Sequence, residues 1–197
     1  MRRVLFLAAA VVAVCGALVR AEEPAKAKVA IGEPAPAFQI KDQAGKAIDL
    51  AELTKSGPVL VRLTCGCSGC DKELAYFQQI HESYKNQGLT SLLIFREPDE
   101  KVAKYAAEKK LNTLYAVDSQ GESWKTFQTT AMPINFLIAK GGKVVSIAKG
   151  CDPSGLLANM VSEKVATVVG SEAVDVQKVV AEKQPAPATD KKTTEKK

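Results

Sequence analysis

The sequence predicts an α/β fold, with a central mixed sheet flanked by helices on both faces and an N-terminal β-hairpin extension. Short apolar runs typical of buried strands alternate with helical segments, which favours parallel pairing of the first core strands. Two strand-like segments joined only by a turn precede them, and two more flank a Gly-Gly turn near the end. The two hairpins add antiparallel pairs, so we expect a mixed sheet.

The elements of the first half follow one another closely. Residues 38–40 alternate as a strand, Gln43 to Lys46 form a turn, and residues 47–50 return as a second strand. After Pro58, the apolar run 59–63 predicts the buried central strand. A helix is predicted over residues 71–86, ending before Gly88.

The second half continues the alternation. Strands are predicted at 89–95 and 115–117, and helices at 99–110 and 122–127. Residues 134–139 and 143–148 flank Lys140-Gly141-Gly142 as a hairpin. A final helix is predicted from Pro153 to about residue 169.

The N-terminus has the pattern of a secretory signal peptide over residues 1–21. Met1-Arg2-Arg3 is positive, an apolar run of about 16 residues follows, and Val19-Arg20-Ala21 fits a cleavage site. This run is shorter than the ~20 residues that usually span a bilayer. We therefore expect an exported protein, periplasmic or secreted; the alternative is a membrane protein anchored through this retained segment.

The remaining chain divides into three parts. Residues 22–30 are expected to be a linker and residues 31–169 one domain, and residues 170–197 form a charged, Pro- and Lys-rich tail expected to be largely disordered. The net charge of +5 falls to +2 without Arg2, Arg3 and Arg20. Basic residues form no cluster typical of nucleic-acid binding, so no nucleic-acid partner is expected.

Four cysteines remain after the signal peptide: Cys65, Cys67, Cys70 and Cys151. Three of them lie within six residues, a spacing that favours a reactive pair or a metal site over stapling of distant segments. Cys67 and Cys70 have C-x-x-C spacing at the predicted junction of strand and helix. A helix N-terminus favours a thiolate, and the second thiol is placed to close a disulfide. Zinc binding is also compatible with this spacing.

Three motifs then carry a family resemblance. The segment from Cys67 to Leu74 resembles the C-x-x-C-[RK]-x-E-[LI] motif of TlpA/ResA-type thiol–disulfide oxidoreductases. Residues 31–53 resemble the G-x-x-A-P-x-F…D-x-x-G-K…L-x-x-L opening of the redoxin (AhpC/TSA) superfamily, and residues 132–145 resemble its cis-proline strand and hairpin. Two positions depart from the pattern: Gly66 replaces a bulky residue such as Trp, and Ser68-Gly69 replaces Gly-Pro or Pro-Pro.

The resemblance implies a thioredoxin-like fold and a thiol–disulfide oxidoreductase. It makes Cys67 the attacking thiol, Cys70 the resolving thiol and Pro133 a cis proline that faces them, with Glu73 as a possible accessory near the dithiol. The expected partners are protein thiols or disulfides and an unidentified redox partner. No cofactor is expected.

A thiol peroxidase that uses Cys70 is an alternative, because Cys70-Asp71-Lys72-Glu73-Leu74 also resembles the run around a peroxidatic cysteine. Cys67 stands where those enzymes usually have Thr. Pro133 stands where their arginine stabilises the thiolate, and proline supplies neither its charge nor its donors.

Cys65 and Cys151 leave further alternatives open. The Gly150-Cys151 segment follows the last hairpin, where thioredoxin-like proteins bring a loop to the active-site mouth, so Cys151 is expected near Cys67. Cys65–Cys151 or Cys67–Cys151 disulfides are one alternative. A second is a soft-metal module for copper or zinc, built from Cys65, Cys67, Cys70 and Cys151 with Met132. A spare buried thiol or a structural bridge is the third.

Overall fold

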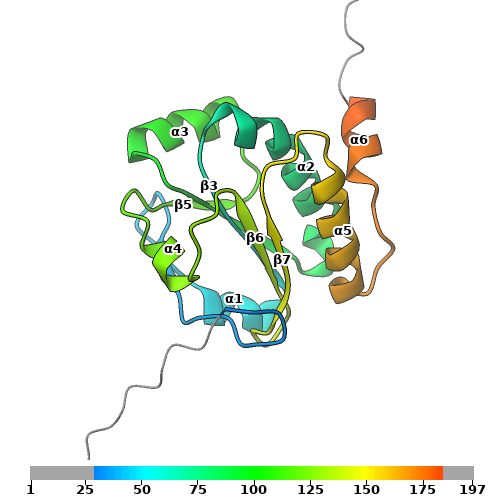
Figure 1. The fold of residues 1–197 in the computed structure, drawn as a ribbon, viewed down its shortest axis with the longest axis horizontal. Helices are drawn as coiled ribbons and strands as arrows, with labels where there is room; N and C mark the ends of the chain where they lie inside the picture. Colours follow the sequence, from blue (N-terminus) through cyan, green and yellow to red (C-terminus); the bar gives the residue numbers. More distant parts are fainter. Residues whose placement is uncertain (1–28, 184–197) are drawn as a thin grey trace, which may run out of the picture.

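Residues 29–183 are described by a computed structural model, in which a five-stranded sheet lies between two layers of helices (Figure 1). The strand order is β5-β4-β3-β6-β7. The strands are β3 (Val59–Thr64), β4 (Thr90–Phe95), β5 (Leu114–Val117), β6 (Ile134–Ile138) and β7 (Val144–Lys149). The β3–β4 and β4–β5 pairs are parallel, and the β3–β6 and β6–β7 pairs are antiparallel. The predicted mixed sheet is confirmed.

A two-stranded extension precedes the sheet. β1 (Gln39–Lys41) and β2 (Ala47–Asp49) pair antiparallel, as predicted. The second strand is predicted to reach residue 50, whereas the structure begins a helix there, α1 (Leu50–Ser56). The reason is an N-cap: the carboxylate of Asp49 accepts hydrogen bonds from the backbone N–H groups of Ala51 at 2.8 Å and Glu52 at 3.3 Å.

Both faces of the sheet are covered. Because side chains alternate along a strand, Val59, Val61 and Leu63 of β3 face one layer and Leu60 and Arg62 face the other. The first three pack in a cluster with the β1–β2 hairpin, Leu50 of α1 and Trp124 of α4 (Glu122–Thr126). The opposite face carries α2 (Ser68–Tyr84), α3 (Asp99–Glu108) and α5 (Leu156–Val169).

The helix after the central strand starts earlier than predicted. It begins at Ser68 rather than residue 71, which places Cys70 in its first turn. It ends at Tyr84 and continues as a short 3-10 turn, η1 (Lys85–Gln87), before Gly88 at φ 93°. The backbone at Gly88 is left-handed, a conformation that glycine adopts readily.

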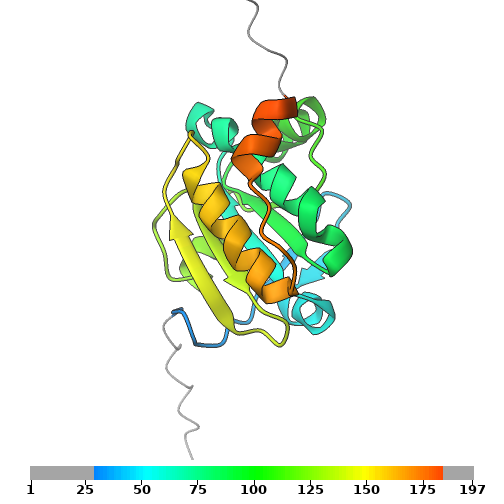
Figure 2. The same ribbon diagram turned by 90° about the vertical axis from the view of Figure 1, so that its right-hand side faces the viewer.

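The folded part extends beyond the predicted domain boundary at residue 169. Helix α6 (Val176–Lys183) packs against α2 and α5 (Figure 2), where a tail was expected. Val176 and Val180, one turn apart, are buried there. The Tyr84 hydroxyl accepts a hydrogen bond from the backbone N–H of Val174 at 2.8 Å and fixes the connection. Two buried valines and this bond therefore order a segment whose composition suggested disorder.

The predicted signal peptide, residues 22–28 of the linker and residues 184–197 of the tail lie outside the described residues. Within residues 29–183, no helix is both long and apolar enough to cross a membrane.

Candidate active site

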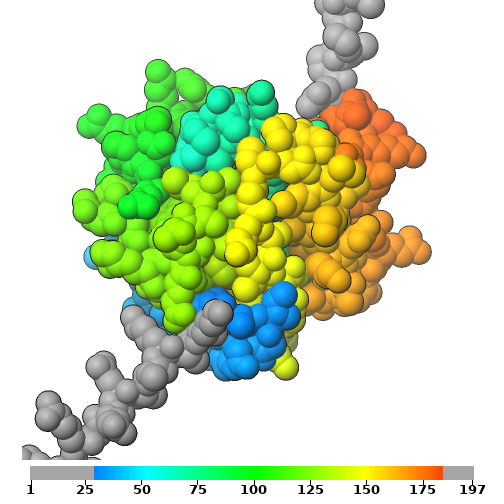
Figure 3. All heavy atoms as spheres, in the orientation of Figure 1, coloured from blue at the N-terminus to red at the C-terminus, as the bar shows by residue number. Residues whose placement is uncertain are grey.

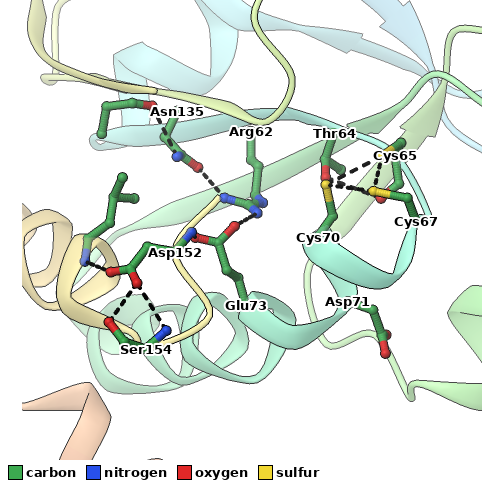
Figure 4. Close-up of polar contacts among 12 residues, drawn as sticks. Arg62, Thr64, Cys65, Cys67, Cys70, Asp71, Glu73, Asn135, Asp152 and Ser154 are labelled. Carbon is green, nitrogen blue, oxygen red and sulfur yellow. Dashed lines mark hydrogen bonds and ion pairs between the residues drawn. The ribbon is translucent and has the colours of Figure 1, made fainter. Parts of the chain in front are cut away.

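The end of β3 and the start of α2 bring three thiols together (Figure 4). The Sγ atom of Cys65 lies 2.7 Å from that of Cys67 and 3.4 Å from that of Cys70. The Cys67 and Cys70 sulfurs are 3.5 Å apart. Cys65 and Cys70 are buried, with 8% and 4% of their surface exposed, whereas Cys67 is exposed. One thiol of the cluster thus faces solvent and two lie behind it.

Cys67 occupies the N-cap position of α2, and no side chain caps that helix end. Its sulfur instead interacts with the backbone N–H groups of Gly69 and Cys70, which the helix leaves without partners in its own first turn. The thiol of Cys65 donates a hydrogen bond to the same sulfur. This bond and the backbone groups lower the pKa of Cys67 from 9.0 to about 7. About half of Cys67 is therefore thiolate at neutral pH.

Cys65 behaves in the opposite way. Burial, together with its hydrogen bond to Cys67, raises its pKa to about 12. It therefore stays protonated at neutral pH and acts as a donor. The sequence offered Cys65 as a disulfide partner of Cys151, a metal ligand or a spare thiol, but not as a hydrogen-bond donor to Cys67. The direction of a side chain just past a strand end depends on backbone turns that the spacing of cysteines does not specify.

A buried ion pair lies behind the cluster. The guanidinium of Arg62 donates to the carboxylate of Glu73 at 2.7 Å and to the side-chain oxygen of Asn135 at 2.9 Å, and it stacks over Phe77 at 3.9 Å. Arg62 and Glu73 are 2% and 1% exposed. Glu73 is therefore buried behind the cluster rather than exposed on the surface of α2. An arginine inside an apolar strand was the sequence signal for this pair.

Glu73 also connects the cluster to the segment after β7. Its second carboxylate oxygen accepts a hydrogen bond from the backbone N–H of Asp152 at 2.6 Å. This bond holds the neighbouring residue Cys151 over the start of α2, where its Sγ lies 3.3 Å from the position that a Cβ on Gly69 would occupy. The predicted approach of this segment to the active-site mouth is confirmed. Burial and the nearby Glu73 charge raise the pKa of Cys151.

All four cysteines of residues 29–183 are free thiols in this structure. Cys65, Cys67 and Cys70 have sulfurs within 4.8 Å of one another, and Cys151 lies outside that group. The four-sulfur cluster considered from the sequence is therefore a group of three, with a fourth thiol beside it.

Two further features lie close to the start of the cysteine cluster, one by strand register and one by sequence. The Met132–Pro133 peptide bond is cis, and Pro133 directly precedes β6. Since Ile134 pairs with Leu63, the same antiparallel register brings Pro133 level with Thr64, the last residue of β3 before Cys65. Gly66, the residue before Cys67, lines a pocket together with Phe95, Val102 and Tyr105. Figure 3 shows the start of α2 at the surface, between α3 and the segment that follows β7.

Comparison with known proteins agrees with this geometry. Residues 31–147 match the AhpC/TSA family. The chain belongs to this family. It is 31% identical over 153 residues to thiol-disulfide oxidoreductase ResA of Bacillus thuringiensis subsp. konkukian, a match that covers 75% of this chain and 88% of the relative. ResA of Bacillus cereus is 33% identical over 124 residues, which cover 62% of this chain and 72% of the relative.

A solved structure supports the fold as well. The thioredoxin domain of a thiol-disulfide oxidoreductase from Bacteroides vulgatus superposes with a TM-score of 0.60 at 25% identity, covering 70% of this chain and 99% of that one. The predicted thioredoxin-like fold is confirmed. Its family and relatives class the chain as a thiol–disulfide oxidoreductase.

Proposed function

We propose that the protein is an exported oxidoreductase that exchanges disulfides with protein partners, with Cys67 as the attacking thiol and Cys70 as the resolving thiol. The observation that carries this assignment is the contrast between the two sulfurs. Cys67 is exposed and its pKa is lowered to about 7, while Cys70 is buried 3.5 Å behind it. An exposed thiolate can meet a partner disulfide, and a buried neighbour can meet only the mixed disulfide that results.

The exchange balances over two steps. The Cys67 thiolate attacks one sulfur of a partner disulfide; that S–S bond breaks, and the released partner thiolate takes a proton. Cys70 then loses its proton and attacks the Cys67 sulfur, closing the Cys67–Cys70 disulfide and releasing the second partner thiol. The partner gains two electrons and two protons, and the dithiol is oxidised. The same steps in reverse oxidise a partner dithiol.

The surroundings of Cys67 suit an extended polypeptide partner. Pro133, level with the end of β3, presents no backbone N–H of its own. Gly66, the residue before Cys67, lines a pocket together with Phe95 and Tyr105. Gly66 adds no side chain to this pocket. The space beside it is open, because a Cβ built at Gly66 would have a Tyr105 ring carbon at 3.9 Å as its nearest neighbour. We assign this pocket to an apolar side chain of the partner.

Export is the part of the proposal that depends on residues 1–21. Their positive start, apolar run and small-residue site are typical of a signal peptide. Cleavage after Ala21 would be seen as a mature N-terminus at Glu22 in protein recovered from the extracytoplasmic fraction. Recovery of the intact chain in the cytoplasm would contradict it.

Mixed-disulfide trapping tests the two thiol roles. The Cys70→Ser variant should accumulate a covalent complex through Cys67 with insulin chains that have been reduced and allowed to reoxidise to disulfides. The Cys67→Ser variant should form none. Cys151→Ser is the matched control, since it removes an exposed thiol of the same site and should exchange disulfides like the parent. Trapping through Cys70 in the Cys67→Ser variant would reverse the assignment. Peroxide consumption that requires Cys70, without disulfide exchange, would replace it by the peroxidase alternative.

A further inference from the structure

Cys65 has no bond-forming step in a two-thiol exchange, yet it lies in the centre of the site. Its sulfur is 2.7 Å from Cys67 and 3.4 Å from Cys70, closer to each than they are to one another. The three residues form a C-x-C-x-x-C pattern whose sulfurs all lie within 4.8 Å. Such a compact group offers three ligands to one ion.

The donors around this group are soft. Asp71, the carboxylate that follows Cys70 in the chain, accepts hydrogen bonds from the Tyr105 hydroxyl and the Lys109 ammonium, each at 2.9 Å. Glu73 is engaged by Arg62 and by the backbone of Asp152. Both nearby carboxylates are thus committed elsewhere, which leaves sulfur as the ligand type. Thiolates select soft ions such as Cu(I) over Mg²⁺, Ca²⁺ or Mn²⁺.

We propose that the reduced protein binds one Cu(I) ion through the sulfurs of Cys65, Cys67 and Cys70. The number of ligands favours Cu(I) over a structural zinc site, which takes four protein ligands, whereas the compact group in residues 29–183 supplies three. Cys151 lies above Gly69, outside the group of three. A three-coordinate thiolate site suits a monovalent d¹⁰ ion, which has no need of the fourth ligand.

The site can adopt the required geometry with a small movement. Three sulfurs that hold an ion at about 2.3 Å in a trigonal plane stand about 4 Å apart. The observed separations are 2.7, 3.4 and 3.5 Å, so the triangle must widen by roughly 0.5 to 1.3 Å. Cys67 is the exposed member and can supply most of this by rotating outward. Cys65 and Cys70 then hold the ion from the buried side.

Charge and protons also balance. Binding replaces the thiol protons by Cu(I) and releases them to solvent, without any change in oxidation state. The negative complex that forms lies at the N-terminus of the 17-residue helix α2, whose free backbone N–H groups already favour the Cys67 thiolate.

Disulfide formation switches the site off. Oxidation joins Cys67 to Cys70 and leaves Cys65 as the one free thiol of the three ligands. The metal-bound state and the disulfide state of the exchange proposed above therefore exclude each other. The binding proposal does not require that exchange, since it needs only the reduced thiols.

Anaerobic titration with Cu(I) held by bicinchoninate tests the site on the chain that begins at Glu22, the form that cleavage after Ala21 would leave and whose cysteines are Cys65, Cys67, Cys70 and Cys151. The reduced protein should withdraw one Cu(I) per chain, and X-ray absorption should show three sulfur neighbours at about 2.3 Å. Cys65→Ser should weaken binding by at least about 100-fold, the upper end of the loss seen when mere supporting residues of metal sites are changed. Cys151→Ser should bind like the parent.

Four results would overturn the proposal. One is retention of parental Cu(I) affinity by Cys65→Ser. The second is equal binding by the reduced and the disulfide-bonded protein. The third is loss of binding in Cys151→Ser, and the fourth is preference for zinc with four sulfur neighbours, since each of these two requires a different ligand set. Circular dichroism of each variant shows whether the fold is kept, so that a loss through unfolding is recognised.

Discussion

The hydrogen bond from Cys65 to Cys67 gives the sharpest test of how this site makes a thiolate. Cys65→Ala removes the donor while the backbone N–H groups at the start of α2 remain. A hydrogen bond to a charged group contributes about 1.5–3 kcal/mol, and solvent around the exposed Cys67 favours the lower end. One pKa unit corresponds to about 1.4 kcal/mol, so the pKa of Cys67 should rise by about 1 unit. At pH 7 the thiolate fraction would then fall from about one half to about one tenth.

The assay is the alkylation rate of Cys67 by iodoacetamide against pH, followed by mass spectrometry of the peptide that contains it. At pH 7 the rate should fall about five-fold in Cys65→Ala. Cys65→Ser keeps an O–H donor at the same place, so its Cys67 pKa should stay within about 0.5 unit of the parent's. Cys151→Ala controls for the loss of a neighbouring thiol. If Cys67 of Cys65→Ala titrates like that of the parent, the helix N-terminus alone sets the pKa and the role given to Cys65 is wrong.

Four further outcomes follow from the structure. Glu73→Gln leaves the buried charge of Arg62 without its counter-ion and should lower the free energy of unfolding in urea by about 3 kcal/mol. Glu122→Gln, in an exposed pair with Lys125, should lower it by less than about 1 kcal/mol. Equal losses in the two variants would contradict the role given to the buried pair. Val176→Ala should cost about 1.5–3 kcal/mol because Val176, the first residue of α6, is fully buried. A loss no larger than that of the exposed Lys178→Ala would show that α6 does not dock. Gly66→Trp should slow insulin reduction several-fold and leave exchange with a small disulfide unchanged; equal rates on insulin would exclude the pocket from substrate binding. The reduced protein should gain stability as the pH rises from about 7 to 9. The pKa of Cys67 is about 7 in the folded state and 9.0 in the unfolded state, so the unfolded state holds more protons in that window. The disulfide-bonded form should lack this gain over the same range.

Much of the fold was predictable because its core strands are short apolar runs between turn residues. The run from Val59 to Leu63 fixed β3, and Lys140-Gly141-Gly142 fixed the β6–β7 hairpin. The errors lie where tertiary contacts override composition. Helix α6 sits in a polar segment and is held by Val176, Val180 and the Tyr84 hydroxyl, contacts that connect residues about 90 positions apart. Nothing local in the sequence specifies them.

The site divides in the same way. The dithiol was predictable from its spacing and from the strand that leads into it. The partners of Arg62 were not predictable. Its bond to Asn135 depends on the register of β3 with β6, which pairs the two residues across the sheet, and its bond to Glu73 depends on the rotation of α2. The same register places Cys65 beyond the last residue of β3, where it turns toward α2 rather than into the sheet.

Three thiols within 4.8 Å would be redundant if they were alike, but burial and hydrogen bonding make them differ. Cys67, at the helix end, has a pKa of about 7, and Cys65, two residues earlier, has a pKa of about 12. Burial raises the pKa of Cys65, and the hydrogen bond in which Cys65 keeps its proton adds to this rise and also stabilises the Cys67 thiolate. A residue change at Cys65 must therefore act on Cys67 even though Cys65 forms no disulfide in the proposed exchange. The same closeness makes Cys65 the third ligand when a soft ion displaces its proton, so the donor of the redox site and the ligand of the metal site are one sulfur in two protonation states.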